Sequence, residues 1–141
     1  MSILKITPLL LLLVIIFGCT ERSPEPGNLQ DAVAQHIEAR EFEEAFEQLN
    51  SAEDRAGRDG AEGPDPQQIT RLRAEAHLAY ANYLTHEADH LAMGERMSDA
   101  LRHYRRVLEL DQNNSQAQTH VELIESIYRQ MDRDIPVGVA E

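Results

Sequence analysis

The chain has 141 residues, a length that suits one domain, and its 42% hydrophobic and 27% charged residues are typical of a folded protein. The 25 acidic residues outnumber the 13 basic residues and give a formal net charge of −12. This charge excludes nucleic acid as an expected partner, because phosphate backbones require a basic surface. It also argues against direct electrostatic docking on anionic lipid.

The first 18 residues have the pattern of an export signal. Lys5 supplies a positive start, and the unbroken apolar run at 9–17 is too short to span a bilayer as a stable helix. The sequence IFGC at 16–19 then resembles the lipobox of bacterial lipoproteins, which implies cleavage before Cys19 and attachment of diacylglycerol and a fatty acid such as palmitate to that residue. The alternatives are an ordinary secretory signal with a chance cysteine, or an uncleaved anchor.

The composition around the cysteine is consistent with an anchored protein. An unpaired thiol in an exported chain would otherwise be open to oxidation, and two or more acyl chains give durable membrane attachment. Thr20 follows the cysteine in place of Asp, which resembles the pattern of lipoproteins sent to the periplasmic face of the outer membrane. Residues 19–27 are rich in proline and small polar residues and predict a flexible tether.

From Leu29 onward, apolar residues recur at three- and four-residue spacing, and no segment alternates as a strand would. The pattern predicts one helical domain over 28–131, with Asn28 as a helix cap, and a weakly packed tail at 132–141. The predicted elements, in chain order, are a helix from Leu29, a helix over 42–52, a loop at 56–66, a long helix from about 67 to Met93 ended by Gly94, a helix capped by Ser98, a break at 109–114 and a helix from about Ser115.

Small and apolar residues at fixed spacing point to one architecture for these helices. The run at 99–128 resembles the junction between two tetratricopeptide repeats, and the stretches at 36–53 and 74–84 are weaker matches. The resemblance covers about residues 29–130 and implies an all-α solenoid of antiparallel helical hairpins, with about two to two and a half repeats. In this family, small residues let helices approach closely and an aromatic residue fills the gap to the next pair. The positions that match this packing are Ala45, Leu49, Ala100, Tyr104, Val107 and Ala117.

The stretch HEADH at 86–90 fits the H-E-x-x-H pattern of zinc peptidases. On a helix, His86 and His90 would share one face, and Glu87 could polarise a metal-bound water. The charged Asp89 in the middle of the motif, and the absence of a predicted strand to align a substrate, favour a different interpretation. The histidines would then be polar residues on the flank of the core.

The sequence therefore predicts a lipid-anchored envelope protein that serves as an adaptor or assembly scaffold, without a catalytic site, metal or cofactor. Tetratricopeptide repeats bind extended or helical segments of other proteins, and the resemblance implies such a partner here. Asn82, His86 and Asp89 are the residues expected to face it. Two alternatives stay open: a small zinc metallopeptidase that uses His86, Glu87 and His90, and a structural homodimer without a peptide groove.

Overall fold

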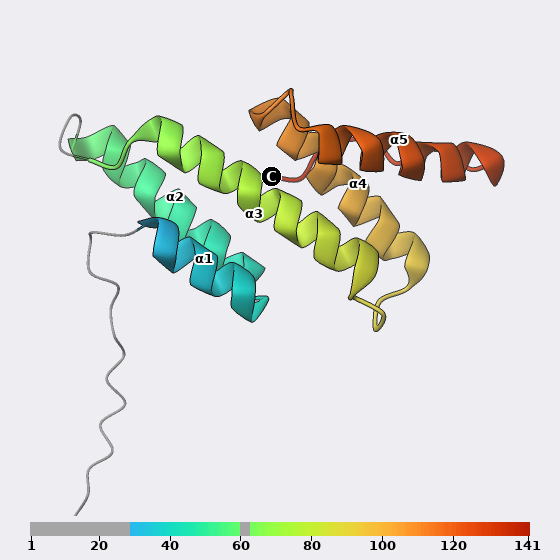
Figure 1. Cartoon of the computed structure of the whole chain (residues 1–141), viewed down its shortest axis with the longest axis horizontal. Helices are drawn as coiled ribbons and strands as arrows, with labels where there is room; N and C mark the ends of the chain where they lie inside the picture. Colours follow the sequence, from blue (N-terminus) through green and yellow to red (C-terminus); the bar gives the residue numbers. More distant parts are fainter. Residues whose placement is uncertain (1–28, 60–62) are drawn as a thin grey trace, which may run out of the picture.

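The computed structural model describes residues 29–59 and 63–141 (Figure 1). This part of the chain contains five helices and no strand, so the all-α prediction is confirmed. The predicted signal peptide, the lipid site at Cys19, the tether and Asn28 lie outside the described residues. The helices are α1 (Leu29–Ala39), α2 (Phe42–Asp59), α3 (Pro66–His86), α4 (Met93–Leu110) and α5 (Ser115–Gln130).

Consecutive helices run antiparallel, and alternate helices run in the same direction. The end of α1 meets the end of α3, because Arg40 reaches Glu87 with Nη2 2.8 Å from Oε2. Further along, α3 and α5 progress side by side: Asn82 contacts Gln116, and one turn later the rings of His86 and His120 lie 5.9 Å apart. Figure 1 shows α1 beside α2 and α3 beside α4.

Two apolar clusters form the core, and α3 contributes to both. The first cluster joins α1, α2 and the first half of α3, and the second joins the end of α3 with α4 and α5. All six positions that match the repeat pattern are fully buried, with Ala45 and Leu49 in the first cluster and the other four in the second. Fully buried alanines allow the close helix approach that larger side chains would prevent.

Local chemistry explains where several of these helices begin and end. Asp65 caps α3 by accepting a hydrogen bond from the Gln67 amide, with Pro66 in the first turn, and Asn114 caps α5 in the same way through Ala117. Arg40 ends α1 in the left-handed conformation at φ 65°, where helices more often place glycine. Arg40 therefore makes the turn between α1 and α2 at a position where glycine is more usual.

The boundaries at the middle of the chain differ from the prediction. α3 ends at His86 instead of Met93, and α4 begins at Met93, so Gly94 lies inside the first turn of α4 rather than ending α3. Ser98 is likewise a residue of α4 and not its cap. At this helix end the Ala88 amide donates to the carbonyl of Tyr83, five residues back, which also accepts from the Glu87 amide, and the chain then turns. α2 also continues four residues into the predicted loop, to Asp59.

The C-terminal tail also differs from the prediction of weak packing. It folds back along α4 and α5, where Ile135 packs against the second cluster and Ala140 is buried. The Ala140 amide donates to the Arg102 carbonyl at 3.1 Å, and the Arg105 guanidinium donates to the carbonyls of Pro136 and Gly138. Hydrogen bonds to main-chain groups hold this segment. Its sequence has no apolar periodicity, so its packing could not be predicted.

Candidate functional site

The place where α3 and α5 run side by side carries a connected set of polar groups. Asn82 of α3 lies at its centre, where its Oδ1 accepts a hydrogen bond from the Tyr104 hydroxyl at 2.9 Å and another from Gln116 Nε2 at 3.1 Å. Thr85 stands 3.3 Å from the same hydroxyl. Both acceptor positions of the Asn82 oxygen are thus used, which fixes the side chain with its amide N–H groups as the remaining donors.

Two histidines extend this polar set by one helical turn. His86 is exposed, and its ring meets the His120 ring edge-on. His120 in turn stacks on Tyr104, with ring centroids 4.7 Å apart and planes within 6°. Burial lowers the pKa of His120, with the neighbouring His86 as a second cause, so that the imidazole favours its neutral form. Burial raises the pKa of Tyr104, against a smaller opposite effect of Thr85.

The predicted partner-binding residues do not all belong to this set. Asn82 and His86 lie together on it, but Asp89 lies in the turn after α3 and pairs with Arg96 at the start of α4, 2.8 Å away. That carboxylate is 84% exposed, whereas the Arg96 side chain is 12% exposed. Asp89 therefore holds the α3–α4 turn to α4, beside the polar face and not on it.

The HEADH stretch leaves the helix after its first residue. His86 is the last residue of α3, Glu87 is the residue that ends it, and His90 follows in an exposed turn. The shared face that a helix would have given to His86 and His90 therefore does not arise. Glu87 instead binds the Arg40 guanidinium with both of its oxygens. Among residues 29–59 and 63–141, no group of three or more His, Cys, Asp or Glu side chains is placed to hold a metal ion.

A second histidine pair, which the sequence did not reveal, is buried between α3 and α4. His77 is fully buried, and its Nδ1 lies 2.9 Å from Nδ1 of His103, so one ring donates and the other accepts. Phe46 covers His77 at 4.5 Å, and Tyr80 meets His103 at 4.6 Å. Finding this pair required the register of α3 against α4, which no local pattern encodes.

The surroundings of this pair keep both rings neutral. Burial lowers the pKa of His77 to about 3, helped by His103 and then by Arg106 and Arg73. Burial also lowers the pKa of His103 to about 4, with Arg102 as a second cause. Neutral rings in tilted and edge-on contact with aromatic neighbours suit a packing role in the core.

Within the described part of the chain, no helix combines the length and the apolar character needed to cross a membrane.

Comparisons of the chain with models of protein families, with curated proteins and with solved structures find no match.

Proposed function

We propose that this chain is a lipid-anchored bacterial envelope protein whose tetratricopeptide-like helices bind a segment of another protein. The observation that carries the proposal is the polar face between α3 and α5, where Asn82 is held by Tyr104 and Gln116. A fixed amide beside exposed polar groups is suited to the main chain of an extended peptide, whose N–H and C=O groups need partners when they bind.

The arrangement of the helices supports this reading. α1, α3 and α5 run in one direction with α2 and α4 returning between them, as the first and second helices of successive repeats do. Small buried residues at Ala45, Ala100 and Ala117 are what close stacking of such hairpins requires. Two and a half repeats are near the lower limit for a stable array, and the packed tail compensates by covering part of the last helices.

A photo-cross-linking experiment in the native envelope tests the proposal. A photoreactive amino acid replaces His86 on the proposed face, and the matched control places it at Glu47 on the exposed side of α2. We expect discrete adducts from position 86 only, and their loss when Asn82→Leu removes the fixed amide. Equal adducts from both positions, or no adduct from position 86, would contradict the proposal.

The lipid anchor has a separate test. The mass of the chain extracted from membranes should exceed that of residues 19–141 by the lipid attached to Cys19, and Cys19→Ser should release the protein from the membrane fraction. Fractionation of the envelope then tests the proposed place on the outer membrane. An unmodified Cys19 would leave the peptide-binding proposal intact and remove the anchor.

An apolar stripe on α5 favours a second candidate, a homodimer. Leu123, Ile127 and Met131 follow one another at four-residue spacing and are 52%, 40% and 50% exposed. Exposed apolar residues in a row on one helix are typical of a surface that another chain covers. Sedimentation should show a dimer that Ile127→Glu disrupts, whereas a monomer at all concentrations would eliminate this candidate.

A further inference from the structure

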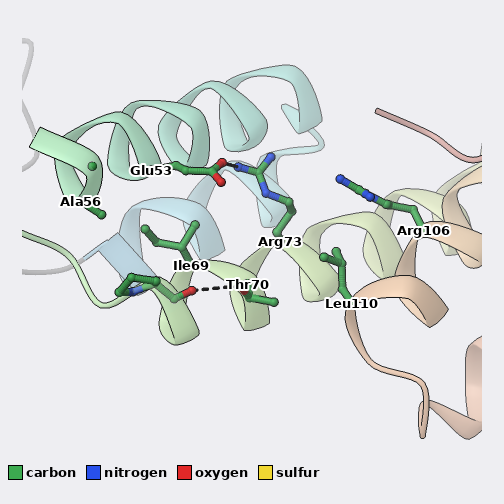
Figure 2. Close-up of a pocket in the computed structure, with 9 residues that line it drawn as sticks. Glu53, Ala56, Ile69, Thr70, Arg73, Arg106 and Leu110 are labelled. Carbon is green, nitrogen blue, oxygen red and sulfur yellow. Dashed lines mark hydrogen bonds and ion pairs between the residues drawn. The ribbon is translucent and has the colours of Figure 1, made fainter.

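A hollow of about 440 Å³ opens where α2, α3 and α4 meet, and Figure 2 shows the residues around it. Its apolar walls come from all three helices, through Ala56 of α2, Ile69 of α3 and Leu110 of α4. Two arginines, Arg73 of α3 and Arg106 of α4, lie among these apolar side chains. The hollow therefore combines apolar surface with two cations in a chain whose net charge is −12.

The Arg106 guanidinium extends toward Arg73, whereas the Arg73 guanidinium turns toward Glu53 of α2 (Figure 2). Arg73 is anchored from the α2 side, because its Nη1 donates to Asn50 Oδ1 at 2.9 Å and its Nη2 to Glu53 Oε2 at 2.8 Å. Arg106 donates to Glu109 on its own helix, with Nη1 2.8 Å from Oε2. Each cation thus pairs with one carboxylate, of which only Glu53 lines the hollow, and none of the described carboxylates bridges the two.

The buried pair of His77 and His103 lies one helical turn from the two arginines. α3 and α4 are antiparallel, which places Arg73 and His77 on α3 opposite Arg106 and His103 on α4. The Nε atom of Arg106 and the Nε2 atom of His77 are both buried without a hydrogen-bond partner among the described residues. A buried donor or acceptor that has left water without gaining a partner is unfavourable until a ligand or water supplies one.

We propose that this hollow binds a carboxylate that carries a short apolar side chain, with its two oxygens between the Arg73 and Arg106 guanidinium groups. The planar guanidinium fork matches a carboxylate in two parallel hydrogen bonds. The apolar part of the ligand would lie against Ile69 and Leu110. Glu53 in the hollow and Glu109 beside Arg106 favour a singly charged carboxylate over a doubly charged phosphate, because each added negative charge is repelled by theirs.

Such a carboxylate has two sources, the C-terminal end of a protein chain and a free small acid. The site is separate from the polar face proposed to bind a peptide. Arg73 and Asn82 are nine residues apart on α3, which places them on opposite sides of a helix with 3.6 residues per turn. The result at one site therefore leaves the proposal for the other unchanged.

Three probes test the site on the purified full chain: acetyl-Gly-Ser-Leu with a free carboxylate, the same peptide as its C-terminal amide, and 4-methylpentanoate. Binding is followed by calorimetry and by the NMR signals of the arginine Nε–H groups. We expect the free carboxylates to shift the signals of Arg73 and Arg106, and the amide to leave them unchanged. If only the peptide acid binds, the source is a chain end; if 4-methylpentanoate binds as tightly, a small acid suffices.

The critical variant is Arg106→Gln. Arg106 pairs with Glu109 on its own helix, so loss of this ion pair disturbs the fold little. We expect it to weaken carboxylate binding roughly tenfold or more, since it removes a charge-assisted pair. The matched control is Arg102→Gln, one turn earlier on α4, which also pairs with an acidic residue three positions away. If Arg106→Gln alters the circular dichroism spectrum, Arg106→Lys keeps the charge, removes the fork and should weaken binding as well.

Three results would overturn the site. One is that neither acid shifts the Arg106 signal at about 10 mM, a concentration that detects even weak affinity. Another is that the amide binds as tightly as the acid, because the carboxylate would then contribute nothing. The third is that Arg102→Gln weakens binding as much as Arg106→Gln.

Discussion

At the scale of single residues, the pair of His77 and His103 makes the stability of the folded chain depend on pH. The two rings share one hydrogen bond between Nδ1 atoms, which exists only while at least one ring is neutral. Arg73, Arg102 and Arg106 lower the pKa values of the pair further by their charges. Each histidine therefore binds a proton more readily in the unfolded chain, where its pKa is about 6.5.

The stability of the protein should fall in mild acid for this reason. Both folded-state pKa values are depressed, so the stabilisation is complete above pH 6.5 and is lost as pH falls toward about 4 for His103 and about 3 for His77. The slope is at most about 1.4 kcal/mol per pH unit for each proton. Urea unfolding at several pH values between 7 and 4 measures it.

The double variant His77→Phe/His103→Phe should reduce this loss of stability at low pH, since it keeps two rings and removes both titrating groups. The exposed His90→Gln is the control and should leave the slope unchanged. If the double variant still lost stability at low pH to the same extent, other groups would be the cause.

The ion pair between Arg40 and Glu87 should contribute little stability. Both side chains are about half exposed, and exposed pairs contribute about 0.2–1 kcal/mol even with good geometry. We expect Glu87→Gln to lower the free energy of unfolding by less than about 1 kcal/mol. A double-mutant cycle with Arg40→Gln measures the coupling, and a value of several kcal/mol would contradict this expectation.

Sequence reasoning reached some of these residues and missed others. The residues that match the repeat pattern could be picked out because burial of small and aromatic residues follows helical spacing. The network of Asn82, Tyr104 and Gln116 could be guessed only in part, because its members come from three helices. The histidine pair and the two arginines of the hollow depend on the register between α3 and α4, which the sequence does not display.

At the scale of the elements, helix existence was easier to predict than helix ends. All five helices were expected, because apolar spacing over a dozen or more residues is a strong signal. The end of α3 was misplaced by seven residues because the stretch after His86 contains no Gly or Pro until Gly94. The departure from the helix is a backbone event, in which the Ala88 amide donates to the carbonyl of Tyr83, five residues back, and no residue type in the sequence marks it.

The position of Gly94 within α4 leads to a prediction about stability. A Cβ atom at Gly94 would meet no atom within 4 Å, and the backbone is helical there. Gly94→Ala should therefore stabilise the protein, by up to about 1 kcal/mol, because alanine loses less backbone entropy in a helix. Thermal unfolding measures the gain.

Gly138 provides the contrast. It has the same open space around it but a φ of 90°, which side chains other than glycine rarely adopt. Gly138→Ala should destabilise the packed tail, by about 1 kcal/mol or more. If Gly94→Ala were also destabilising, Gly94 would have the helix-ending role that its sequence context suggests.

At the scale of the whole molecule, α3 is the only described helix that contributes buried residues to both core clusters. Each cluster is stabilised mainly by the helices that pack around it, so the two ends of the molecule can open to different extents. Leu49→Ala creates a cavity in the first cluster, which should cost about 2–5 kcal/mol.

Hydrogen exchange should locate this loss of stability. We expect faster exchange in α1 and α2 of the Leu49→Ala variant, with a smaller change in α4 and α5. Leu101→Ala, in the second cluster, is the matched substitution and should give the opposite distribution. A uniform increase along the chain in either variant would mean that the two clusters unfold as one unit.

The packed tail makes the two sides of α5 different. Gln116 and Glu125 are nine residues apart and hence on opposite sides of α5; the first faces Asn82, and the second binds Arg105 beside the tail. The Ala140 amide also donates to the Arg102 carbonyl, so the tail that follows α5 is attached to α4. Gln116 and the apolar stripe of α5 are exposed, so a partner of the proposed kind would reach α5 there, whereas the side that carries Glu125 lies beside the protein's own tail.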